Sequence, residues 1–177
     1  IADGRLGVDD IWERLRRLLE AKKLGAAKLA AAYLPAGQAP AAKTLEAVAD
    51  KPLRHLALLP DHFAAGRQGR EMALFALQRL ARNDPQQAAQ QWDKIRSKFS
   101  AADRGYLYGQ LGWQAALKHQ PEALGWYAQA AGAPLSEEQL AWKARAALRA
   151  LDWAVVHEAI EQMPKAMQAR PDWVYWL

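Results

Sequence analysis

Apolar side chains recur along the chain at helical spacing from its first third onward. In residues 8–25 the apolar positions fall on one face of a helix: Ile11, Leu15, Leu18 and Leu19. Asp10 is the expected N-cap of this helix, with Glu13 three residues later completing a capping box. Gly25 is the expected C-terminal stop. A second short helix is predicted over 26–35, ended by Pro35.

The next stretch, about 36–66, is the least regular part. Pro40, Pro52 and Pro60 divide it, and each is tolerable as the first residue of a short helix. This pattern predicts irregular short helices up to about residue 66.

From about residue 69 the pattern becomes regular. It predicts three helix pairs: 70–84 with 85–99, 100–120 with 121–133, and 135–151 with 152–164. Capping side chains are expected at Asp84, Ser100, Ser136 (with Gln139 in a capping box) and Asp152. Proline is expected at the first helical position at Pro85, Pro121 and Pro171.

These hairpins repeat every 30 to 36 residues, close to the tetratricopeptide period of about 34 residues. Gly112 and Ala115 occupy the small-residue contact of such repeats, and Tyr127 the aromatic position. We therefore predict an all-α fold, a right-handed α-α superhelix of tetratricopeptide-like hairpins. Residues 1–177 would form one segment of a single superhelical domain, irregular over about 1–66 and regular over about 69–177.

Composition supports the helical prediction. Only ten residues are β-branched (four Ile, five Val and one Thr), whereas Ala, Leu, Gln, Glu, Lys and Arg dominate. No apolar run approaches the ~20 residues that span a bilayer, so a soluble chain is expected. The absence of cysteine excludes disulfides and thiolate chemistry. The net charge of +5 favours polyanionic partners, without choosing among them.

Three of the eight tryptophans lie within the last 25 residues: Trp153, Trp173 and Trp176. Because repeat hairpins bury their apolar faces against neighbours, we expect this aromatic end to continue into further repeats. The chain also begins at Ile1 rather than at methionine, so a section of a longer protein is expected. The stripe Trp153, Val156, Ile160 and Met163 is predicted to be core. Trp113 and Trp126 suit core packing and a groove-lining role equally.

No catalytic, cofactor-binding or metal-ligating residue is predicted. His55 and His62 stand seven apart without a carboxylate pair at ligand spacing, and no phosphate loop, nucleophile elbow or zinc helix occurs. The acidic pairs at 9–10 and 137–138 suit the first turns of helices. A basic strip is read as a solvated helix face in preference to an anion-binding face: Arg14, Arg16, Arg17, Lys22, Lys23 and Lys28.

Residues 137–177 resemble the soluble lytic murein transglycosylases of Gram-negative bacteria. In that family a helix ending W-x-x-R-A-A-L-R is followed by D-W, an I-x-x-M helix and a W-x-Y-W helix. The matching residues are Trp142, Arg145, Ala146, Ala147, Leu148, Arg149, Asp152, Trp153, Ile160, Met163, Trp173, Tyr175 and Trp176.

The resemblance implies a periplasmic enzyme with a long superhelical, U-shaped N-terminal domain. A separate lysozyme-like domain would use one glutamate to cleave the β-1,4 bond between N-acetylmuramic acid and N-acetylglucosamine, leaving a 1,6-anhydro end. The E-S and G-L-M-Q segments of that domain occur nowhere in this sequence, so no catalytic residue carries over. The implied role is a non-catalytic segment. Its implied partners are glycan strands, through the whole enzyme, and the enzyme's own catalytic domain, with peripheral membrane or cell-wall association.

Two other functions are alternatives to a transglycosylase segment. A free-standing tetratricopeptide-like scaffold would bind a protein partner in its concave groove. A basic helical-repeat RNA binder is disfavoured, because the basic residues are scattered rather than placed at one position per repeat, and no nucleic-acid partner is expected.

Overall fold

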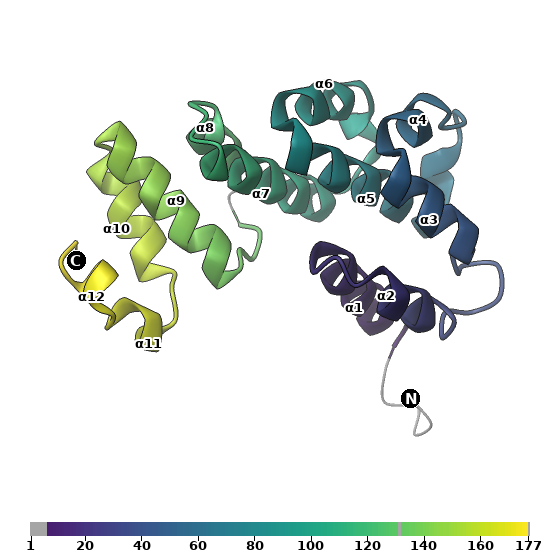
Figure 1. Cartoon of the computed structure of the whole chain (residues 1–177), viewed down its shortest axis with the longest axis horizontal. Coiled ribbons are helices and arrows are strands. Elements are labelled where there is room, and N and C mark those ends of the chain that lie inside the picture. The colour runs from purple at the N-terminus through teal and green to yellow at the C-terminus, as the bar shows by residue number, and fades with distance from the viewer. Residues whose placement is uncertain (1–6, 131, 177) are drawn as a thin grey trace. The chain divides into compact units, whose positions relative to one another are not determined.

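The computed structural model describes residues 7–130 and 132–176, and these residues form helices joined by turns, with no strand among them (Figure 1). The all-α prediction is confirmed. The chain divides into two compact units, residues 1–83 and 84–177. Among the described residues, no helix is both long and apolar enough to cross a membrane. The single superhelical domain over 1–177 stays a prediction.

The first unit contains five α-helices and one short 3-10 helix within its described residues. They are α1 (Val8–Glu20), α2 (Leu24–Ala31), α3 (Ala42–Asp50), α4 (Pro52–Ala57), the 3-10 helix η1 (Phe63–Ala65) and α5 (Arg67–Asn83). Helix α5 packs against α1, α3, α4 and η1, so it is the centre of this unit. Ten of the eleven residues from Glu71 to Ala81 are buried.

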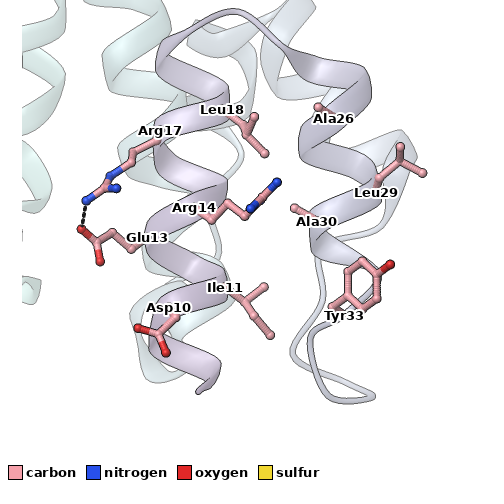
Figure 2. Close-up of a pocket in the computed structure, with 10 residues that line it drawn as sticks. All are labelled: Asp10, Ile11, Glu13, Arg14, Arg17, Leu18, Ala26, Leu29, Ala30 and Tyr33. Carbon is pink, nitrogen blue, oxygen red and sulfur yellow. Dashed lines mark hydrogen bonds and ion pairs between the residues drawn. The ribbon is translucent and has the colours of Figure 1, made fainter. Parts of the chain in front are cut away.

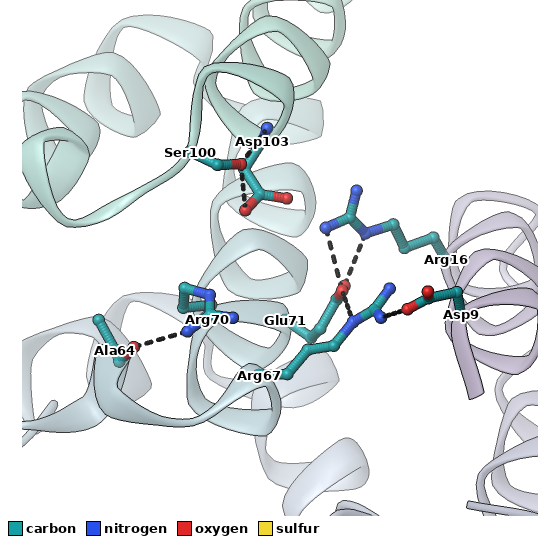
Figure 3. Close-up of polar contacts among 8 residues, drawn as sticks. All are labelled: Asp9, Arg16, Ala64, Arg67, Arg70, Glu71, Ser100 and Asp103. Carbon is teal, nitrogen blue, oxygen red and sulfur yellow. Dashed lines mark hydrogen bonds and ion pairs between the residues drawn. The ribbon is translucent and has the colours of Figure 1, made fainter.

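An ion-pair network joins α1 to α5 inside this unit (Figure 3). The Glu71 side chain is only 4% exposed, and its oxygens accept from Arg16 Nε at 2.6 Å and Arg16 Nη2 at 3.0 Å. Arg67 Nε donates to the same carboxylate at 3.2 Å, and Arg67 also pairs with Asp9. A buried carboxylate must be neutralised in this way, because an unpaired charge in the interior is strongly unfavourable.

The second unit begins with α6 (Pro85–Ile95) and a 3-10 turn η2 (Arg96–Lys98). It continues with α7 (Ala101–Leu117), α8 (Ala123–Gln129), α9 (Glu137–Ala150), α10 (Trp153–Glu161), α11 (Lys165–Gln168) and α12 (Pro171–Val174). The closest-packed pairs are α7 with α8 and α9 with α10, and α9 also packs against α7. The predicted hairpins over 100–133 and 135–164 are therefore confirmed.

Most predicted helix caps in the regular part are present. The side chains of Asp84, Ser100 and Asp152 accept hydrogen bonds from backbone N–H groups three residues on, at 2.9, 3.1 and 3.2 Å. Ser136 and Gln139 form the reciprocal capping box, with Gln139 Oε1 accepting from Ser136 N at 2.8 Å. These bonds satisfy N–H groups that a helix start leaves without partners.

Proline and glycine positions were predicted less well. Pro52, Pro85 and Pro171 open helices as expected. Pro40 precedes the start of α3 by two residues, Pro60 lies in a turn, and Pro121 lies in the turn before α8. Proline fixes φ but also suits turns, so the local signal alone does not separate the two uses.

The first helix starts and ends earlier than predicted. Gly7 is its N-cap, and Asp10 is the third helical residue, whose carboxylate accepts from Gly7 N at 2.8 Å. The predicted N-cap role of Asp10 with Glu13 is therefore wrong. The helix ends at Glu20 because Lys22 turns the chain at φ 60°, and Gly25 lies inside α2.

The small-residue contact predicted for the repeats is present between α7 and α8. A Cβ added to Gly112 would lie 2.9 Å from Cγ of Tyr127 and about as close to both neighbouring ring carbons. The Tyr127 ring is 2% exposed, and Ala115 is fully buried in the same cluster. Glycine is therefore required at position 112 for the ring to reach the backbone of α7.

We expect Gly112→Ala to lower the free energy of unfolding by about 1–3 kcal/mol, because the new methyl group overpacks a rigid ring. Chemical denaturation measures the change.

Gly125→Ala in α8 is the matched control, since nothing lies within 4 Å of the Cβ it adds. It should raise the free energy of unfolding by about 0.5–1 kcal/mol through helix propensity. Equal effects of the two substitutions would contradict the close contact.

Candidate functional site

The family-motif residues of 137–177 gather around one arginine. Arg145 on α9 places its guanidinium carbon 5.2 Å from the ring centroid of Trp142 and 4.9 Å from that of Trp173. Among the described residues, Arg145 has no carboxylate partner. Its charge is therefore held by two aromatic faces, an arrangement that arginine favours over lysine.

The core of this hairpin contains most of the motif's apolar residues. Ile160 is fully buried, Met163 is 3% exposed and Trp173 is 2% exposed, all in one cluster with Val156. Leu148 and Trp176 pack against this cluster from its edge. Asp152 caps α10 and so sets where the second helix of the hairpin begins.

Trp153 does not belong to the core, and that prediction is wrong. Its side chain is 50% exposed, although Val156, Ile160 and Met163 of the same predicted stripe are buried. Trp153 is the first residue of α10, immediately after the turn in which Leu151 has a φ of 57°. Its ring stacks on Trp176 instead, with centroids 5.9 Å apart and planes inclined by 21°.

Tyr175 continues this exposed aromatic group. It is 80% exposed, and its ring meets the edge of Trp176 at a centroid distance of 4.8 Å. The order of aromatic residues in the motif therefore divides by burial, with Trp173 inside and Trp153 and Tyr175 outside.

Trp113 and Trp126 pack around the Tyr127 cluster. Both are partly buried, together with Trp142, against the buried residues of α7, α8 and α9. Tyr127 itself donates from its hydroxyl to the Gln139 carbonyl at 3.0 Å. Burial, with a smaller contribution from the charge of Glu138, raises the pKa of Tyr127 above its usual range, so the hydroxyl stays a hydrogen-bond donor.

No metal site emerges from the described residues, because no three His, Asp or Glu side chains converge there. His55 lies half-buried on α4, and its Nε2 has no hydrogen-bond partner within residues 7–130 and 132–176. Burial lowers the pKa of His55, because it disfavours the charged imidazolium. A lone histidine of this kind does not form a catalytic arrangement.

The predicted basic strip of the first helices is not a continuous cationic face. Arg16 pairs with the buried Glu71, Arg17 pairs with Glu13 on the same helix, and Lys28 pairs with Glu46 on α3. Arg14 differs, because its guanidinium has no hydrogen-bond or ion-pair partner among the residues that the structure describes.

Arg14 lies in a groove between α1 and α2 with a volume of about 550 Å³ (Figure 2). It points from α1 toward α2, between Ile11 and Leu18, whereas the Glu13–Arg17 pair is directed to the other side of α1. The groove is lined by Asp10, Ile11, Glu13, Arg14, Arg17, Leu18, Ala26, Leu29, Ala30 and Tyr33. Sequence reasoning found Arg14 only as a member of the strip, since pairing across helices decides which arginine is left over.

The solved structures that are similar to this chain include two lytic transglycosylases. The inactive mutant of lytic transglycosylase Slt from Pseudomonas aeruginosa matches 99% of this chain with a TM-score of 0.68 and 25% sequence identity. The 70-kDa soluble lytic transglycosylase in complex with bulgecin A also matches 99% of it, with a TM-score of 0.59 and 21% identity. The chain spans 28% and 29% of those two proteins' lengths.

No protein-family model and no curated protein matches the sequence. The structural match confirms the resemblance to soluble lytic transglycosylases. It also extends the resemblance from the last 40 residues to nearly the whole chain.

We expect Arg145→Met to lower the free energy of unfolding by about 1–2 kcal/mol, because it removes a cation held between two aromatic faces while keeping the side-chain length. The free energy of unfolding of Arg145→Lys should lie between that of the unchanged chain and that of Arg145→Met. Thermal or urea denaturation followed by tryptophan fluorescence measures the change.

Arg170→Met is the control for this experiment, since Arg170 makes only an exposed pair with Asp172. Its cost should not exceed about 0.5 kcal/mol. A neutral Arg145→Met variant would mean that the guanidinium does not stabilise the motif.

The free energy of unfolding should fall in acid partly through His55. Because the folded-state pKa lies below the usual value of 6.5, its contribution is complete above pH 6.5 and is lost as the pH falls through the lowered pKa. Urea denaturation at pH 7.5 and pH 5 should show a smaller pH difference for His55→Gln than for the unchanged chain. His157→Gln, at an exposed position, should leave that difference as it is, and an unaltered pH difference in His55→Gln would contradict the assignment.

Proposed function

We propose that this chain is a non-catalytic segment of the superhelical region of a periplasmic lytic murein transglycosylase. The observation that carries the proposal is the structural match over 99% of the chain to lytic transglycosylase Slt, at 25% identity and a TM-score of 0.68. Because the chain corresponds to only 28% of that protein, the activity is assigned to the parent enzyme and not to these residues.

The motif in the second unit gives independent support. Trp142, Arg145 and Trp173 match the family pattern in sequence, and they meet in one cation–π arrangement in the structure. A contact among residues that lie far apart in a sequence motif is stronger support for a family relationship than a general likeness among α-helical folds.

The helix spacing supports a superhelical repeat. The first helices of successive pairs, α5, α7 and α9, begin at residues 67, 101 and 137, so the intervals are 34 and 36 residues. Stacked helix pairs of this length build extended curved surfaces. We infer that the parent's right-handed α-α superhelix uses such a surface to hold glycan strands near a separate lysozyme-like domain.

The basic composition of this chain suits a segment that attracts the polymer while another domain of the parent enzyme cleaves it. The chain carries a net charge of +5. A basic segment of the enzyme attracts an anionic cell-wall polymer and raises its local concentration. Cleavage of the β-1,4 bond to a 1,6-anhydro end belongs to the parent's lysozyme-like domain.

The experiment compares two proteins on purified sacculi. The protein encoded by the complete gene should release muropeptides with 1,6-anhydro ends, detected by mass spectrometry. The 177-residue chain alone should release none. A muramidase that uses water serves as the product control, because it leaves reducing ends.

A complete protein that yields no anhydro-muropeptides, or whose gene encodes no lysozyme-like domain, would contradict the proposal. A tetratricopeptide-like scaffold would then be the better function, and a defined protein ligand should be found. Anhydro products released by the 177-residue chain itself would show that it is catalytic.

A further inference from the structure

The groove between α1 and α2 contains one charged side chain, that of Arg14, which forms no ion pair or hydrogen bond with the described residues. Glu13 and Arg17 neutralise each other, and Asp10 accepts a hydrogen bond from the Gly7 N–H that begins the helix. Among the described residues only Arg14, of the charged groups lining the groove, has no bonded partner. Its guanidinium is directed into the groove (Figure 2).

The walls beside Arg14 are apolar and partly uncovered. Ile11 and Leu18 flank it on α1, Leu29 lies on α2, and Tyr33 lies in the turn that follows α2. Leu29 is 71% exposed and Tyr33 57% exposed, whereas Ile11 is 8% exposed. Large apolar side chains placed around a single cation favour a ligand that carries an anionic group next to small apolar groups.

We propose that this groove binds the peptide stem of peptidoglycan, a short peptide rich in alanine methyl groups and free carboxylates. A carboxylate of the stem accepts two parallel hydrogen bonds from the Arg14 guanidinium. An alanine methyl group of the stem packs against Leu18, Leu29 and the ring of Tyr33. This assignment rests on the proposed function, which supplies the polymer.

The groove's chemistry favours the peptide over the sugar strand. Sugars present many hydroxyl groups and require several polar partners. Half of the ten lining residues are aliphatic, and the charged ones other than Arg14 already have partners at α1. A volume of about 550 Å³ lies within the range of pockets for small ligands and suits three or four small residues. The unpaired guanidinium of Arg14 can bind one of the free carboxylates of the stem.

The probe for the test is the tripeptide L-Ala-γ-D-Glu-meso-diaminopimelate, titrated into the 177-residue chain and followed by backbone amide NMR. We expect shifts confined to α1 and α2. Arg14→Gln should weaken binding about tenfold or more, because a bidentate bond to a charged group is lost. Tyr33→Ala should also weaken it.

Arg170→Gln is the matched control, because Arg170 is an exposed arginine that pairs with Asp172 and does not line the groove. Its affinity for the tripeptide should stay within about twofold of that of the unchanged chain, a difference of only a few tenths of a kcal/mol. Circular dichroism and the melting temperature of each variant confirm that it is folded before its affinity is compared.

Two further probes define the ligand. A chitin tetrasaccharide, which lacks the peptide, should produce no shifts in α1 or α2. An all-L peptide of equal charge should bind at least about tenfold more weakly than the tripeptide. No binding of the tripeptide, shifts elsewhere in the chain, or an unchanged affinity in Arg14→Gln would overturn the proposal, and equal binding of the all-L peptide would replace it with a general acidic-peptide site.

The two proposals fail separately. Tripeptide binding in α1 and α2, with no anhydro products from the complete protein, would leave the groove assigned and remove the transglycosylase function. Anhydro products without tripeptide binding would do the reverse.

Discussion

The close approach of one helix to the next is the constraint on which this structure depends. Between α7 and α8 the Tyr127 ring lies against the backbone of α7 at Gly112, where any Cβ would come within 2.9 Å of the ring. The same ring is fixed at its other end by the bond from its hydroxyl to the Gln139 carbonyl of α9. One side chain therefore sets the spacing of three helices, and the tryptophans around it fill the remaining space.

The first unit meets the same requirement with charge as well as apolar packing. Helix α5 is buried along most of its length, and Glu71 within it is neutralised by Arg16 and Arg67. Pairing of this kind neutralises two arginines, Arg16 and Arg67. It also explains how the chain can be basic overall and still leave only one unpartnered guanidinium facing the α1–α2 groove.

The sequence motif shared with lytic transglycosylases corresponds to a set of packing contacts in this structure. The motif arginine is placed between the rings of Trp142 and Trp173, and those two tryptophans come from different helices. The motif residues thus belong to one packed group of helices. Asp152 caps the start of α10, and Trp173 is buried in the hydrophobic core between α9 and α10. A family that shares this unit shares the way its helical pairs are joined, whatever reaction the complete protein performs.

The sequence by itself determined the local features of this protein. Helical periodicity and capping side chains predicted the all-α fold, the hairpins over 100–133 and 135–164, and the starts of α6, α7, α9 and α10, because each depends on residues within a few positions. The tertiary structure alone decided which side chains are partners. Trp153 stacks on Trp176 and is not buried in the core. Arg16 pairs with Glu71, 55 residues away, whereas Arg14 lines the groove without such a partner among the described residues. Such choices depend on contacts between separate helices, which hydrophobic periodicity does not encode.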